Sequence, residues 1–130
     1  MAAAFASKPL PALPDAAAPD GSDVRILLSL AGGSMAHFSL APGRVSKAVR
    51  HRSVEEIWFI LAGAGEMWRR ADGVEEVTAL APGLSLAIPV GTVFQFRSTG
   101  AEGLQAVAVT MPPWPGADEA VVEAGIWAAG

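Results

Sequence analysis

Short runs of alternating apolar and polar residues make up most of the chain from residue 23 onward, and glycine or proline separates one run from the next. A period of two places successive side chains on opposite faces of a strand. Many short strands at regular spacing are typical of an all-β sandwich or barrel. The pattern predicts strands over residues 23–31, 34–41, 45–51, 55–61, 64–70, 74–80, 84–88, 92–98 and 103–111.

The residues between these runs predict turns and little helix. Asp72-Gly73 lies between two runs and predicts a two-residue hairpin, because both central positions of such a turn favour a positive φ. Residues 111–115 contain three prolines, which withhold amide donors, so this segment cannot be a central strand. We expect it to lay Trp114 over one end of the barrel. Residues 117–124 could form a short helix after Gly116.

The first 22 residues differ from the rest in being rich in alanine and proline. This composition predicts an extended N-terminal arm or a disordered tail over residues 1–22, and an extended arm could also pair with a neighbouring subunit. Residues 23–130 are then a single domain, because 130 residues in total are enough for one hydrophobic core and not for two.

Composition removes several classes of function. The longest apolar stretch, residues 57–64, is far shorter than the ~20 residues of a membrane-spanning helix. A net charge of −4 gives no electrostatic basis for binding nucleic acid. The absence of cysteine excludes disulfides and thiolate metal sites. The N-terminal residues lack the features of a signal peptide, so we expect a cytoplasmic protein with neither nucleic acid nor a membrane as partner.

Two spaced groups of residues stand out within residues 34–110. The first group is Gly43, His51, Glu56 and Gly63, and the second is Gly83, Pro89 and Gly91. In order and spacing these residues resemble the two motifs of the cupin family. The resemblance implies a double-stranded β-helix, or jelly-roll barrel, with a pocket that opens at one end.

The same resemblance shows what the chain lacks. Cupins usually hold iron, manganese, zinc, nickel or copper on three histidines and one glutamate, and of these only His51 and Glu56 remain here. The other two histidine positions of the motifs hold Val49 and Phe94, which cannot coordinate a metal. Two ligands make a weak site, since a catalytic metal normally takes three from the protein. The expected cofactor is therefore none, or a weakly bound divalent metal.

Two further side chains could substitute as metal ligands. His37 lies on a predicted strand, but Phe38 and Leu40 form the more apolar face there, which leaves His37 on the opposite face. Gln95 would turn inward only if the strand register shifted by one residue, which would also turn its phenylalanine neighbours outward. The chain has two histidines, so three cannot come from one subunit.

His51 and Glu56 are the candidate catalytic residues. Glu56 lies in a very apolar strand, where burial without a partner is costly and raises the pKa of a carboxyl group. An imidazole that titrates near neutrality suits acid–base chemistry. We hypothesise that the two side chains form a hydrogen-bonded pair that moves a proton on a bound ligand. Glu55 should point to the opposite face and lie at the surface.

Apolar side chains on the inward face of the predicted strands are the candidate ligand-binding residues, although in a small barrel they could simply fill the core. With the polar Gln95 included, the candidates are Val49, Trp58, Ile60, Phe94, Gln95 and Phe96. Together they predict a mostly apolar pocket for a small organic molecule.

These observations favour a small-molecule-binding cupin with metal-independent or weakly metal-dependent acid–base chemistry of the isomerase, cyclase, dehydratase or decarboxylase type. The first alternative is a ligand-binding module without turnover. The second is a metal-dependent oxygenase or isomerase with a non-standard ligand set. Family resemblance also implies a homodimer, in which Trp114 and Trp127 could pack against the second subunit or against their own barrel.

Overall fold

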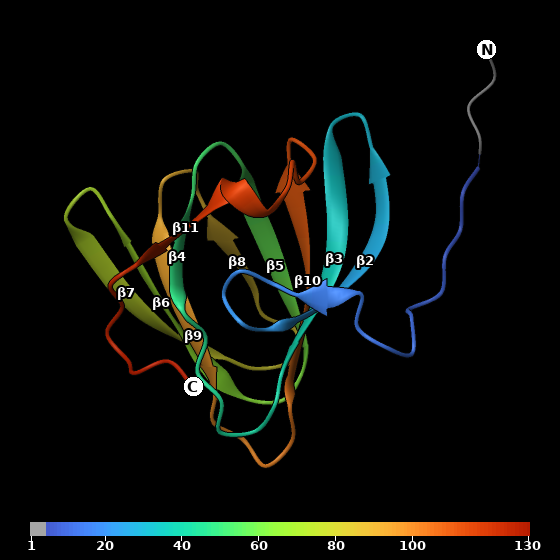
Figure 1. Cartoon of the computed structure of the whole chain (residues 1–130). Helices are drawn as coiled ribbons and strands as arrows, with labels where there is room; N and C mark the ends of the chain where they lie inside the picture. The colour runs from blue at the N-terminus through green and yellow to red at the C-terminus, as the bar shows by residue number, and fades with distance from the viewer. Residues whose placement is uncertain (1–4) are drawn as a thin grey trace.

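The computed structural model describes residues 5–130, which form eleven strands in two antiparallel sheets (Figure 1). The first sheet has six strands in the order β1 (Ala16–Ala17), β2 (Asp23–Leu30), β3 (Gly33–Leu40), β10 (Leu104–Met111), β5 (Glu55–Ala62) and β8 (Ser85–Ile88). The second has five in the order β11 (Ala120–Glu123), β4 (Ala48–His51), β9 (Val93–Ser98), β6 (Gly65–Ala71) and β7 (Val74–Leu80).

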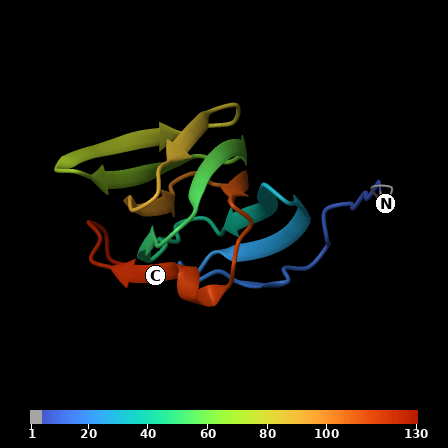
Figure 2. The same ribbon diagram turned by 90° about the horizontal axis from the view of Figure 1, so that it is seen from above.

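The predicted all-β fold is confirmed, and each predicted strand overlaps an observed one. The two sheets face one another (Figures 1 and 2), and the core lies between them. Strand β5 shows why this sequence forms such a layer. Glu56, Trp58 and Ile60 are buried. The alternate residues Ile57 and Phe59 are exposed, and so is Glu55, as predicted. Period-two alternation therefore sets the register of the inner face.

The hairpin between β6 and β7 also agrees with the sequence. Asp72 has a φ of 51° and Gly73 a φ of 75°, as a two-residue turn with positive φ at both central residues requires. The two strands then pair from Ala71–Val74 back to Gly65–Leu80.

The tail corrects one prediction. Residues 117–124 form only a single 3₁₀ turn, Ala117–Glu119, which is followed by β11 and not by a helix. Strand β11 pairs with β4, with Ala120 opposite His51. The β-branched pair Val121-Val122 favours a strand, and the unpaired edge of β4 supplies hydrogen-bond partners that an isolated short helix would lack.

The segment before β2 packs against the barrel of its own subunit. Ala16 and Ala17 pair with Val24 and Asp23 of the same subunit, and the Lys47 amide donates to the Asp20 carbonyl at 2.7 Å. In Figure 2 this segment and the C-terminal segment with β11 run along the same side of the barrel. The first four residues of the predicted 1–22 arm lie outside the described residues, and pairing with a second subunit stays a prediction.

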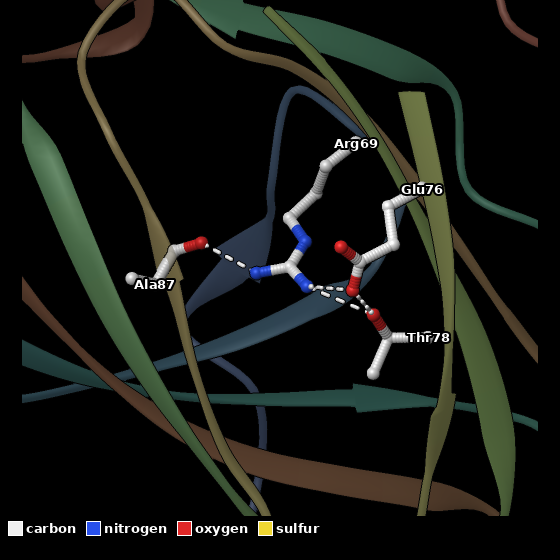
Figure 3. A network of polar contacts seen from close by, with 4 residues as sticks. All are labelled: Arg69, Glu76, Thr78 and Ala87. Carbon is white, nitrogen blue, oxygen red and sulfur yellow. Dashed lines mark hydrogen bonds and ion pairs between the residues drawn. The ribbon is translucent and has the colours of Figure 1, made fainter. Parts of the chain in front are cut away.

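The edges of the two sheets are joined by Arg69 of β6 (Figure 3). Its guanidinium donates to the Ala87 carbonyl of β8 at 2.8 Å and to the Thr78 hydroxyl of β7 at 2.8 Å, and it lies 3.3 Å from the Glu76 carboxylate. Arg69 therefore bridges the six-stranded sheet and the β6–β7 hairpin. Among residues 5–130, no helix has the length and apolar character that crossing a membrane requires.

Candidate functional site

A cavity of about 400 Å³ lies between the two sheets. Its walls come from the segment before β2 and from strands β2, β3, β4, β5, β9 and β10, and residues 113–120 also contribute. Most of the lining is apolar. The ionisable side chains that line it are those of Asp20, His51 and Glu56. The cavity is within the range of volumes that small-ligand sites have in proteins.

Glu56 is placed in the cavity by the alternation of β5 and is 3 % exposed. One of its carboxyl oxygens accepts a hydrogen bond from Trp58 Nε1 at 2.9 Å. Burial raises the pKa of Glu56 to about 7, the Trp58 hydrogen bond opposes this rise, and the charge of Asp20 adds to it. Glu56 is therefore a carboxyl group that can either give or take a proton near neutral pH.

His51 ends β4 and is 5 % exposed. Its ring meets Phe94 edge-on, with 5.2 Å between ring centroids, and Trp114 at 5.1 Å. The Nδ1 atom has no hydrogen-bond partner in the part of the chain that the structure describes. Burial lowers the pKa of His51 to about 4, against an opposing effect of the Glu119 charge. The imidazole is therefore neutral at pH 7. A neutral imidazole has one nitrogen that donates a hydrogen bond and one that accepts, so it can hydrogen-bond a ligand.

The predicted hydrogen-bonded pair of Glu56 and His51 does not form. Both side chains line the same cavity, but Glu56 bonds to Trp58, and His51 Nδ1 stays unpaired. The physical reason lies in their strands, because His51 is on β4 of one sheet and Glu56 is on β5 of the other. A ligand in the cavity could contact both residues.

Glu119 fixes the wall beside His51. Its carboxylate accepts hydrogen bonds from the Ser53 hydroxyl and from the amides of Ser53 and Val54, the last at 2.8 Å. Burial alone would raise the pKa of Glu119, but these hydrogen bonds outweigh it and lower the pKa. The contact holds the 3₁₀ turn against the loop that follows His51, and so keeps the residues around Trp114 at the cavity.

Asp20 is the ionisable site residue that the sequence analysis did not identify. Its side chain is 6 % exposed and lines the cavity, and Oδ1 accepts hydrogen bonds from the Ser22 amide at 2.8 Å and the Ser22 hydroxyl at 2.6 Å. Burial raises its pKa, although the Ser22 bonds act in the opposite direction. The signal available was Asp20-Gly21-Ser22, in which an aspartate can bond to the backbone two residues on. That signal predicts a turn and not a pocket.

The predicted ligand-binding residues occupy two depths. Val49, Trp58 and Phe94 line the cavity. Ile60 and Phe96 lie in the core and do not line it, and the Phe96 ring packs against Trp58 with centroids 5.0 Å apart. Phe38, which was not among the predicted residues, also lines the cavity and stacks on Trp58 with centroids 5.3 Å apart and planes 6° from parallel.

Neither proposed substitute ligand reaches the cavity. His37 is buried on the opposite face of β3, where its Nε2 lies 3.0 Å from Oε1 of Gln105. Gln95 donates to the carbonyls of Ser46 and Trp127 and accepts from the amides of Ile126 and Trp127, so its amide group holds the C-terminal segment. The register that would turn Gln95 inward is not adopted, because Phe94 and Phe96 occupy the inner face.

The aromatic residues of the tail contact their own barrel. Trp114 lines the cavity and contacts His51, which agrees with the expectation that it covers one end of the barrel. Trp127 packs under the Arg97 guanidinium, 4.3 Å from its ring centroid. Packing of either tryptophan against a second subunit stays a prediction.

Comparison with known proteins agrees with this architecture. The sequence profile described as "Cupin domain" matches residues 36–110. The chain belongs to the cupin family. This cupin matched none of the curated proteins by sequence.

Solved structures share the fold of this cupin at low sequence identity. A predicted oxalate decarboxylase from Thermotoga maritima is 23% identical, with 69% of this chain and 79% of that chain covered and a TM-score of 0.60. KdgF from Halomonas sp. is 18% identical, with coverage of 73% and 82% and a TM-score of 0.63. An uncharacterised double-stranded β-helix protein from Klebsiella pneumoniae is 18% identical, with coverage of 80% and 85% and a TM-score of 0.65.

The metal that many cupins carry does not fit the residues of this cavity. Valine and phenylalanine stand at two positions of the motif where histidine would coordinate, and both line the cavity. Across residues 5–130, no three His, Cys, Asp or Glu side chains are grouped so that they could hold a metal ion. The ionisable groups that line the cavity are instead the Asp20 and Glu56 carboxyls and the His51 imidazole.

Proposed function

We propose that this cupin binds a small organic molecule and transfers a proton on it without a metal, with Glu56 as the proton-transfer group. The observation that carries the proposal is the position of Glu56, a buried carboxyl group that lines an otherwise apolar cavity. A pKa of about 7 makes both protonation states of Glu56 available at neutral pH. General acids and bases are most effective when their pKa lies near the working pH.

His51 has the complementary role in this proposal. Burial keeps its imidazole neutral, while burial keeps Glu56 partly protonated, so the two groups have pKa values pushed in opposite directions. Such a separation supports assignment of distinct roles to two ionisable groups in one site. The neutral imidazole would hydrogen-bond the ligand and orient it toward Glu56. Reactions of the isomerase, cyclase, dehydratase or decarboxylase type require such a proton transfer.

A binding module without turnover is the second candidate. It is favoured by the missing contact between Glu56 and His51, because among residues 5–130 neither of these two groups orients the other. The aromatic lining from Trp58, Phe94 and Trp114 would hold a ligand equally well without any reaction.

Deuterium exchange separates these possibilities. The protein is incubated in D₂O with a fractionated small-molecule extract, and mass spectrometry identifies any compound that gains deuterium. We expect exchange with the wild type and with Glu55→Gln, an exposed neighbour on the opposite face, but not with Glu56→Gln. Retention of a compound without exchange in the wild type would indicate a binding module. Exchange that a chelator abolishes and added metal restores would overturn the metal-independent proposal.

We also propose that the protein is a cytoplasmic homodimer, as expected from the sequence and the family. The outer face of β5 exposes Ile57, Phe59 and Leu61, which is apolar surface that a second subunit could cover. Light scattering coupled to size-exclusion chromatography measures the molar mass, and a monomeric mass at micromolar concentration would overturn the dimer.

A further inference from the structure

The charges at the cavity are all acidic or neutral. Asp20 and Glu56 line it together with the neutral His51, and no lysine or arginine is among the described residues that form its walls. The ion pairs seen within residues 5–130 lie elsewhere, between Arg50 and Glu123, Arg69 and Glu76, and Arg97 and Glu66. A carboxylate or phosphate ligand would therefore meet like charge and no counter-ion.

The two cavity carboxyl groups have only neutral hydrogen-bond donors. Asp20 accepts from Ser22, and Glu56 accepts from Trp58. Both side chains are more than nine-tenths buried. Burial of an ionised carboxylate is costly unless an opposite charge compensates it. The charge of Asp20 also disfavours ionisation of Glu56, because it raises the pKa of Glu56. A positive charge between them would remove both costs.

The aromatic lining of the cavity independently favours a positively charged ligand. Phe38, Trp58, Phe94 and Trp114 all line the cavity that the two carboxyl groups share. Aromatic rings attract ammonium groups through the negative potential of their faces, and sites for quaternary ammonium ligands use several such rings. His51 lines the same cavity, and its buried Nδ1 has no hydrogen-bond partner among residues 5–130.

We propose that the ligand of this cavity is an organic ammonium ion, held by the Asp20 carboxylate and the aromatic walls. The inference rests on the binding pocket of the proposed function and adds the charge class of its ligand. Asp20 is then the counter-ion, and Glu56 remains the group that transfers the proton. A metal cation is a poorer occupant, because no three ligating side chains of residues 5–130 come together.

Three probes of nearly the same shape test the charge. Choline, 3,3-dimethylbutan-1-ol and 3,3-dimethylbutanoate share a branched end and differ in charge as cation, neutral molecule and anion. Calorimetric titration of the full chain should show choline binding at least about tenfold more tightly than the alcohol, which corresponds to about 1.4 kcal/mol. The anion should not bind. Equal affinities, tighter binding of the anion, or no binding of choline at millimolar concentration would overturn the proposal.

Two variants localise the effect. In Asp20→Asn the side-chain oxygen can still accept from Ser22, but the charge is gone, so choline affinity should fall about tenfold while the affinity of the alcohol stays the same. Asp23→Asn is the matched control, because Asp23 is exposed and does not line the cavity. It should bind choline like the wild type. Unchanged choline affinity in Asp20→Asn contradicts the proposed counter-ion.

Binding should also release protons. A cation stabilises the ionised carboxyl groups, so choline affinity should rise as the pH increases toward and past 7, and the observed heat should depend on the ionisation enthalpy of the buffer. Stoichiometric displacement of choline by Mn²⁺ or Zn²⁺ would overturn the organic ligand. If choline fails to bind while a neutral compound shows Glu56-dependent deuterium exchange, this inference falls and the proposed function stands. If choline binds but no compound exchanges deuterium, this inference stands and the proposed proton transfer falls.

Discussion

Arg69 and Glu56 lie in different sheets of one small barrel, and their charged groups differ in the partners that surround them. The Arg69 guanidinium, at a sheet edge, contacts an acceptor carbonyl, a hydroxyl and a carboxylate from the chain itself (Figure 3). The Glu56 carboxyl, in the cavity, has one neutral donor. The partners of Arg69 come from the protein itself, whereas Glu56 has no charged partner among the described residues and is available to a ligand.

The same contrast applies to the energetics of each group. Arg69 is partly exposed, so its contacts cost little desolvation and contribute little net stability. Glu56 is buried and its ionised form is disfavoured. Natural proteins commonly place such unfavourable groups at functional sites.

Glu56→Gln should have the largest effect on how stability depends on pH. The pKa of Glu56 is raised from 4.5 to about 7, so the stability it contributes is fully present below pH 4.5 and is lost as the pH rises through about 7. A shift of this size corresponds to about 3 kcal/mol. Urea titrations measure the free energy of unfolding of the variant minus that of wild type. This difference should increase by about 3 kcal/mol between pH 4.5 and about 7. Glu55→Gln is the exposed control, and parallel curves for Glu56→Gln and wild type would contradict the account.

His51→Gln should change the pH dependence in the opposite direction. The pKa of His51 is lowered from 6.5 to about 4, so the stability linked to its neutral form is present above pH 6.5 and is lost as the pH falls through about 4. We expect about 2 kcal/mol, because solvent in the cavity screens part of the effect. Relative to wild type, the variant should gain stability on acidification. A variant that loses stability on acidification as steeply as wild type would show that folding does not lower the pKa of His51.

Arg69→Lys should have the smallest effect and should leave the pocket unchanged. Lysine cannot reproduce the forked contacts of the guanidinium with β7 and β8, but the site is partly exposed, so we expect a loss of about 0.5–1 kcal/mol. Urea titration at one pH measures this loss, and choline titration should give the wild-type affinity. A change in choline affinity would show that the sheet edge and the pocket are coupled, so that Arg69 and Glu56 would not have separate roles.

Much of the fold could be read from the sequence because it depends on local patterns. The hairpin at Asp72-Gly73 follows from residues that accept positive φ, and the inward face of Glu56, Trp58 and Ile60 follows from alternation. The motif spacing also placed His51 and Glu56 at one pocket. The hairpin and the alternation are decided by neighbours along the chain, whereas the shared pocket followed from the resemblance to the cupin motifs.

The remaining features depend on contacts between distant segments. Asp20 becomes a pocket residue only because its segment folds back beside β2 and bonds to Lys47. Gln95 is directed outward by Ile126 and Trp127, and residues 120–123 form a strand because β4 has an open edge. No periodicity within a single segment carries this information, so the sequence alone left Asp20 unassigned and treated Gln95 as a candidate ligand.

The central claim is that Glu56 is a neutral-pH acid–base group, and its titration can be followed directly. NMR of protein labelled with ¹³C in the glutamate carboxyl groups, with Glu56→Gln to assign the signal, gives the midpoint for this one residue. The account predicts a midpoint near 7 in the free protein, as burial among apolar walls requires. A midpoint near the ordinary 4.5 of a glutamate would contradict it.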